Sequence, residues 1–270
     1  MREADFRRIF MEATHRQIIL IVFQVLFFSQ VFGQDTTTID FYDRIKAYDY
    51  SVIIAPDSIV IEDLEGWEEK IECGEILGFI GDDYHRFFIH FISVIQNPIN
   101  PYEYFVYGKT KVKDNVCSYQ GTITVKQARI YKRGDIPGYT QGFVICDVIL
   151  FEDKKQPSAG LIKGNLTSYF LIDYKGRFRY DAIAYASDGF SNNQFIGNWT
   201  SYTTNISKKC HWGDSRIPES GDLDIGAGEF SVNPKYVENG WANLALAWGS
   251  YPVTPEMLVA RQKENEEWWK

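Results

Sequence analysis

The sequence lacks the short motifs that mark the common catalytic centres. Its 270 residues contain no G-x-S-x-G nucleophile turn, no H-E-x-x-H zinc motif and no phosphate-binding glycine loop. The four cysteines include no C-x-x-C pair, and their spacing does not resemble a zinc framework. No stretch of the chain therefore forces an enzyme assignment.

The chain also lacks a basic stripe. Its formal net charge is −8, and removal of residues 1–33 would take away four basic and three acidic residues and move it to −9. An acidic protein without clustered lysine or arginine repels a phosphate backbone. Nucleic acid is therefore excluded as an expected partner.

A long hydrophobic run is missing as well. The longest charge-free apolar stretch, residues 18–33, has 16 residues, whereas a spanning helix needs about 20. Because arginines precede this stretch and small residues end it, residues 1–33 are predicted to be a secretory signal peptide, with Met1 or Met11 as the start. An uncleaved anchor helix is the alternative. We expect a secreted or periplasmic protein with no stable membrane insertion after cleavage.

Cysteines are few, and an oxidising compartment would allow them to pair. Cys73, Cys117, Cys146 and Cys210 permit two disulfides in three connectivities. Cys146 lies in an apolar run and is equally consistent with a buried thiol. The favoured single bridge joins Cys117 to Cys210, since both flank strands.

Aromatic residues are abundant, and their pattern predicts an all-β fold. Phe, Tyr and Trp make up 16% of the chain, a composition that suits strands. Strand-like segments joined by short turns occur at residues 76–80, 84–95, 102–113, 119–131, 142–151, 159–173 and 177–184, with an eighth at residues 195–202. A meander of this length hides its edges by closing. The sequence predicts a mainly antiparallel up-and-down β-barrel or sandwich of about eight strands.

The two ends of the chain differ in character from this meander. Residues 34–50 are polar and are predicted to be an N-terminal arm, and residues 51–232 the barrel-like domain. Asn233-Pro234 and Thr254-Pro255 each combine a capping residue with proline at the first helical position. Residues 233–270 are therefore predicted to form short C-terminal helices that pack on the barrel.

Residues 188–230 are rich in Asn, Asp, Gly and aromatic side chains and form the most distinctive stretch. Asp222 and Asp224 precede Gly226 like the opening of a calcium loop, although the third oxygen ligand and the bidentate Glu are missing. No cofactor is expected, and Ca²⁺ at Asp222 and Asp224 is the open alternative. Five carboxylates within sixteen residues also permit glycosidase chemistry, which requires two of them to face each other; they are Asp214, Glu219, Asp222, Asp224 and Glu229.

Two resemblances accompany this stretch. The text FIGNWTSY, with Gly197 and Trp199, resembles the Gly-x-Trp strand of lipocalin-type (calycin) barrels. That family carries the motif on its first barrel strand, whereas here the long meander precedes it. The sequence also contains the segments YGKTKVKDNVCSYQGTITV, GLIKGNLTSYFLID, SNNQFIGNWTSY, KKCHWGDSRIP and GDLDIGAGEF. With these segments, residues 76–236 resemble a group of uncharacterised secreted bacterial β-rich proteins, which implies a secreted β fold and no known activity.

Three functions follow as hypotheses. The first is a secreted non-enzymatic binding protein for a small apolar molecule or a glycan, held in the interior or at the mouth of the barrel. Its predicted ligand-binding residues are Trp199, Trp212, Tyr169, Phe170 and Asn193. The second is a secreted, glycosidase-like hydrolase that uses the loop carboxylates. The third is a structural or interaction protein of the cell envelope with no ligand.

Overall fold

A closed eight-stranded antiparallel β-barrel is the centre of the protein. The computed structural model describes residues 37–62, 68–74, 76–249 and 252–270, and residues 39–270 form one compact unit. The barrel strands are β4 (Leu77–Ile80), β5 (His85–Gln96), β6 (Glu103–Val112), β7 (Asn115–Tyr131), β8 (Thr140–Glu152), β9 (Gly160–Ile172), β11 (Asn192–Ser201) and β12 (Ser207–Asp214). The predicted antiparallel barrel is confirmed, and the barrel closes where β12 pairs with β4.

Side chains alternate between the inner and the outer face of the barrel along each strand. In β8, Val144, Cys146, Val148 and Leu150 face inward and are fully buried, and the residues between them face outward. In the interior Trp212 stacks on Phe195 at 3.6 Å between ring centroids and lies 5.9 Å from Phe87. The inward side chains thus pack against one another in one hydrophobic cluster.

The last barrel strand differs from the prediction. Residues 177–184 were expected to be a barrel strand, but they contribute only β10 (Phe178–Tyr180), a short strand paired with the outer end of β9. The barrel is completed instead by β12, for which no strand was predicted. The first half of β12 carries the exposed residues Lys208 and Lys209, so its sequence lacks the apolar alternation typical of a strand. Its second half buries Cys210 and Trp212.

The segment before the barrel enters the core instead of forming an arm. After β1 (Thr38–Asp40), Phe41, Ile45 and Tyr50 are fully buried in the barrel cluster. They belong to or flank two single-turn helices, α2 (Tyr42–Ile45) and α3 (Ser51–Ile54). Residues 51–54 are helical, although the run Val52-Ile53-Ile54 favours a strand locally, because Asp49 accepts from the Ser51 amide and Ile53 and Ile54 face the core. The hairpin β2 (Ser58–Glu62) and β3 (Glu68–Glu72) follows.

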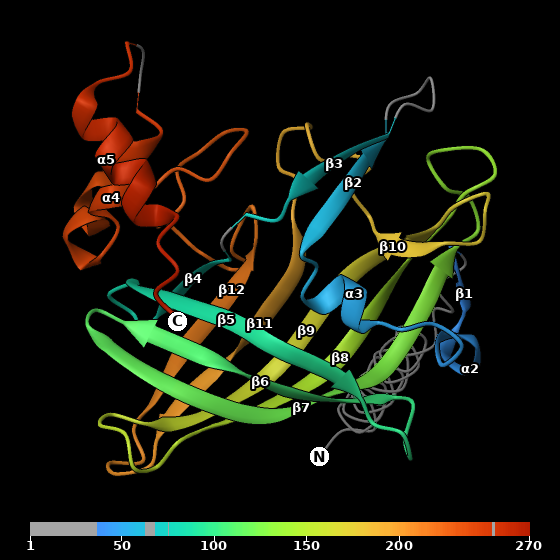
Figure 1. Cartoon of the computed structure of the whole chain (residues 1–270), viewed down its shortest axis with the longest axis horizontal. Helices are drawn as coiled ribbons and strands as arrows, with labels where there is room; N and C mark the ends of the chain where they lie inside the picture. The colour runs from blue at the N-terminus through green and yellow to red at the C-terminus, as the bar shows by residue number, and fades with distance from the viewer. Residues whose placement is uncertain (1–36, 63–67, 75, 250–251) are drawn as a thin grey trace, which may run out of the picture. The chain divides into compact units, whose positions relative to one another are not determined.

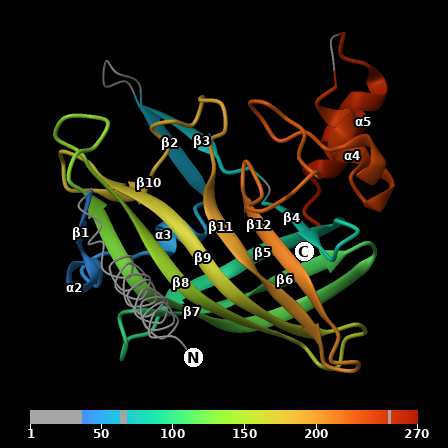
Figure 2. The same cartoon turned by 180° about the vertical axis from the view of Figure 1, so that it is seen from behind.

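The C-terminal region lies outside the barrel beside β4 and β5 (Figures 1 and 2). It contains η1 (Pro234–Asn239), α4 (Ala242–Ala247) and α5 (Pro255–Glu264), which confirms short helices after Asn233 and Thr254. Buried Arg86 of β5 contacts it: the guanidinium stacks on Trp241 and pairs with Glu264 at 3.4 Å. At the end of the chain Trp269 stacks on His90, with ring centroids 3.7 Å apart. None of the described helices is long and apolar enough to cross a bilayer.

Candidate functional site

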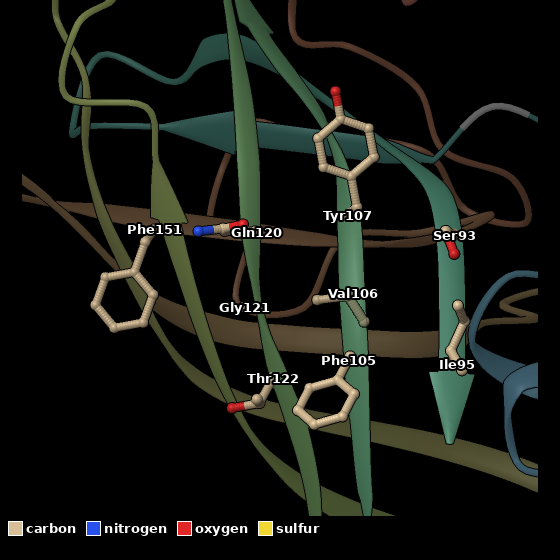
Figure 3. A pocket seen from close by; sticks show the side chains of 9 residues that line it. All are labelled: Ser93, Ile95, Phe105, Val106, Tyr107, Gln120, Gly121, Thr122 and Phe151. Atoms are coloured by element: carbon tan, nitrogen blue, oxygen red, sulfur yellow. The ribbon is translucent and has the colours of Figure 1, made fainter. Parts of the chain in front are cut away.

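An open pocket of about 470 Å³ lies on the outer wall of the barrel, across β5, β6, β7 and β8 (Figure 3). Its centre is a row of outward side chains that pair in register across the four strands. Phe151 pairs with Gln120, Gln120 with Tyr107, and Tyr107 with Ser93. A ligand lying across the strands would therefore meet a ring, an amide, a second ring and a hydroxyl in turn.

The large apolar groups of this pocket are unusually exposed. The exposed fraction is 46% for Phe105, 44% for Tyr107, 48% for Phe151 and 61% for Ile95. In Figure 3, Phe151 and Phe105 lie on opposite sides of the two polar side chains of β7, Gln120 and Thr122. Exposed aromatic groups gathered in a concave site, with a few polar groups among them, are typical of a binding surface.

Two inward-facing glycines lie behind this row. A Cβ at Gly121 would stand 2.0 Å from the Ile149 carbonyl oxygen, and one at Gly108 would stand 2.0 Å from the His90 carbonyl oxygen. Glycine in a strand permits such close backbone approach and a sharper bend of the sheet. These contacts leave no space for a side chain at either position, so the backbone of the pocket floor is fixed by the barrel wall.

A second cluster of polar groups lies inside one end of the barrel. Asp214 Oδ2 accepts hydrogen bonds from the Tyr180 hydroxyl (2.9 Å) and from Asn193 Nδ2 (2.8 Å). Asn193 Nδ2 also donates to the Ile53 carbonyl, and Asn193 Oδ1 accepts from Ser168 Oγ. Burial raises the pKa of the Asp214 carboxyl to about 7, although both donors favour its charged form. This cluster connects the N-terminal segment to the barrel and holds a carboxyl that titrates near neutrality.

Glu152 is the buried carboxyl near the opposite end of the barrel. It accepts from the Trp199 indole (2.8 Å), the Gly160 amide (2.7 Å) and the Thr110 hydroxyl. Burial raises the pKa of Glu152, and these three donors oppose the rise. Gly197 of the Gly-x-Trp motif lies two residues before Trp199 on β11, the seventh strand of the barrel.

The structure does not bring the five predicted ligand-binding residues together. Trp212 and Phe170 are fully buried in the interior, and Trp199 binds Glu152 at one end. Asn193 belongs to the Asp214 cluster, whereas Tyr169 packs against Phe143 with ring centroids 6.4 Å apart. Asn193 and Trp199 thus each bind a buried carboxyl whose pKa is raised, Asp214 and Glu152 respectively, at opposite ends of the barrel.

The two predicted calcium ligands each bind a basic side chain. Asp222 pairs with Lys235 and accepts from the Tyr236 hydroxyl, whereas Asp224 Oδ2 accepts from Arg216 at 2.6 Å. Among the described residues no group of three or more His, Cys, Asp or Glu side chains could hold a metal ion. The side-chain partners of Asp214, Asp222 and Asp224 are all different, so these carboxylates form no shared cluster.

All four cysteines are free thiols in this structure. The bridge expected between Cys117 and Cys210 is not formed, and both thiols are buried. Burial raises the pKa of Cys117 to about 11 and of Cys146 to about 12, because a thiolate is poorly solvated there. Neither thiol is therefore an activated nucleophile.

The residues of the outer pocket were not among the predicted sites, although the sequence holds a signal for them. In β6, Phe105 and Tyr107 share their alternation with Lys109 and Lys111, and charged side chains mark the outer face of a strand. Aromatic residues on a solvated face are the unusual observation. Comparison with protein-family models, curated proteins and solved structures finds no significant match.

Proposed function

We propose that the protein is a secreted, non-enzymatic binding protein that holds a glycan on the outer wall of its barrel. The observation that carries the proposal is the row Phe151–Gln120–Tyr107–Ser93 in an open pocket. Sugar rings present apolar C–H faces that stack on aromatic rings, and hydroxyls that bond to amides and alcohols. Alternating rings and polar groups match both requirements.

The spacing of the two rings supports a chain of sugars as the ligand. Phe151 and Tyr107 stand on strands two apart, which places them about 10 Å from each other because neighbouring strands are about 4.8 Å apart. Alternate units of an extended sugar chain are separated by a similar distance. A small apolar molecule would fill one ring site and leave Gln120 without a partner.

We place the glycan on the outer wall and not in the interior, because the interior side chains already pack against one another. Trp212 and Phe170, the predicted interior contacts, are fully buried against other barrel residues. Phe105, Tyr107 and Phe151 are between 44% and 48% exposed and already face solvent. Binding outside therefore requires no opening of the core.

The experiment is a binding screen on the full chain with soluble glycans in affinity electrophoresis, followed by calorimetry. Tyr107→Ala and Phe151→Ala should each weaken binding about tenfold or more, as removal of a central aromatic contact does. Tyr174→Ala is the matched control, since Tyr174 is 64% exposed and lies outside the pocket. The proposal would be overturned if no glycan showed saturable binding, or if both ring variants bound as tightly as the unmodified protein.

A hydrolase is the second candidate, and Asp214 is the observation that favours it. Its carboxyl has a pKa of about 7, suited to a general acid or base, and accepts from Tyr180. The same glycan panel incubated with the protein tests this candidate. Release of reducing ends that Asp214→Asn abolishes would establish hydrolysis, and unchanged glycans would exclude it for that panel.

A further inference from the structure

A second pocket, of about 410 Å³, borders the outer pocket at β5. It is formed between β5, the α3 turn and the β2–β3 hairpin, and the two pockets share one lining residue, Ser93. The register of β5 against β6 shifts between Phe91 and Ser93, so Ile92 is an extra residue there. Ile92 is 45% exposed. The boundary between the pockets is therefore a bulge with one apolar and one hydroxyl side chain.

The second pocket differs from the first in its chemistry. It has no aromatic side chain on its outer side; Phe91, its one aromatic residue, packs against the barrel cluster. Its lining includes the charged side chains of Lys70 and Asp57 and the hydroxyls of Ser51 and Ser58. Both charged residues are exposed, and neither pairs with any described residue. These groups offer donors and acceptors to a ligand and no surface for stacking.

The direction of the row leads a ligand from the first pocket into the second. From Phe151 on β8 to Ser93 on β5 the row crosses three strand spacings, or about 14 Å. That length exceeds a single sugar unit. A linear chain stacked on Phe151 and Tyr107 would therefore reach Ser93, the residue that lines both pockets.

We infer that the two pockets are consecutive subsites of one groove for a linear oligosaccharide. The aromatic pocket takes stacked units, and the second pocket takes a unit held by hydrogen bonds from Lys70 Nζ and to the Asp57 carboxylate. The inference rests on the proposed function, because the aromatic pocket must bind glycan first. It adds that the ligand is a chain, and that affinity depends on chain length.

The test is calorimetry of the full chain with cello-, xylo- and chito-oligosaccharides, each from dimer to hexamer. For whichever of the three oligosaccharide types binds, the affinity should rise with chain length until the second pocket is filled. Lys70→Ala should then weaken binding of the hexamer about tenfold and leave the shortest bound oligomer unchanged. Lys163→Ala, at an exposed lysine on β9, is the matched control. Tyr107→Ala should weaken binding at every length.

The outcomes separate the two proposals. If Tyr107→Ala weakens binding but Lys70→Ala has no effect, or the same effect at all lengths, the second subsite is wrong and the glycan function stands. An affinity that stops rising at the dimer also overturns the second subsite. If no oligosaccharide binds, or Tyr107→Ala binds like the unmodified protein, the proposed function fails and the extended groove fails with it.

Discussion

Phe151 and Tyr107 lie on strands that do not touch, yet both pair in register with Gln120 on the strand between them. The amide is thereby fixed between two exposed rings, about 5 Å from the strand of each. This relationship places a hydrogen-bonding group at the point where a stacked sugar chain would turn its hydroxyls toward the wall.

Gln120→Ala should therefore weaken glycan binding without affecting the fold. One hydrogen bond to a solvated ligand contributes about 0.5–1.5 kcal/mol, so the affinity should fall about threefold to tenfold. Calorimetry with the best-binding oligosaccharide measures the change. Thr124→Ala, on the same face of β7 outside the pocket, provides the reference, and equal affinity of the two variants would contradict the role of Gln120.

Asp214→Asn should remove part of the pH dependence of stability. The pKa of the carboxyl rises from 3.8 to about 7 on folding, so its stabilising effect is complete below about pH 4 and lost as the pH rises to above 7. Urea unfolding at several pH values should show that the free energy of unfolding decreases less with rising pH for the variant than for the unmodified protein. Glu152 and Asp181, whose pKa values burial also raises, contribute equally to both proteins. Asp82→Asn, at a side chain 90% exposed, should keep the original slope.

Asn193→Ala should destabilise the barrel by about 1–3 kcal/mol or more, because it leaves buried groups of Ile53, Ser168 and Asp214 without a partner. Asn193 also has a φ of +47°, a left-handed conformation that costs a residue with a Cβ about 1–2 kcal/mol. Asn193→Gly should therefore be less destabilising than Asn193→Ala. Urea unfolding of both variants compares them, and an equal loss would show that the backbone conformation carries no strain.

Trp199→Phe should destabilise the fold, because it removes the indole hydrogen bond to the buried Glu152 carboxylate. Phenylalanine keeps much of the ring but removes the bond to Glu152 Oε2, at an expected loss of about 1–3 kcal/mol. The loss should be larger at neutral pH than at acid pH, where the carboxyl is protonated and requires fewer donors. Trp248→Phe, at a tryptophan 67% exposed, should change stability little. A loss independent of pH would assign the effect to packing alone.

Trp269→Ala should raise the pKa of His90. Partial burial lowers the pKa of that imidazole, and Trp269 stacks on it at 3.7 Å with an interplanar angle of 9°. Removal of the indole exposes the ring to water and moves its pKa toward 6.5. A titration followed by NMR measures the shift, with buried His211 as the internal reference. An unchanged His90 titration would mean that the tail does not cover β5 in solution.

The barrel could be predicted because its strands alternate and its turns carry recognisable residues. β12 could not, since Lys208 and Lys209 make its first half polar and only the pairing with β4 and β11 shows the strand. The helical turn Ser51–Ile54 is likewise not evident from the sequence, because a run of β-branched residues favours a strand locally, whereas burial in the barrel stabilises the turn.

The outer pocket could not be predicted because it depends on register. The exposed aromatics of β6 can be recognised from the sequence, but Gln120 lies 13 residues after Tyr107 and Phe151 a further 31 residues on, and no sequence pattern shows that the three align. Only the pairing of β6, β7 and β8 aligns them. Trp212 and Phe170, two of the predicted ligand contacts, are large aromatic side chains that fill the core, and the structure buries both.

The buried N-terminal segment packs against strands that lie far along the sequence. The Tyr50 hydroxyl bonds to Ser168, 118 residues later, and the Ile53 carbonyl accepts from Asn193, 140 residues later. Contacts so distant in sequence slow folding, because the chain loses the entropy of closing a long loop before the stabilising contacts have formed. During synthesis residues 41–55 leave the ribosome well before β11 and β12 have been made. The apolar side chains of this segment therefore stay exposed to solvent until those strands can cover them. A nascent chain stalled before Asp214 cannot complete its core, and chaperone binding to residues 41–55 is expected to last until the final strand emerges.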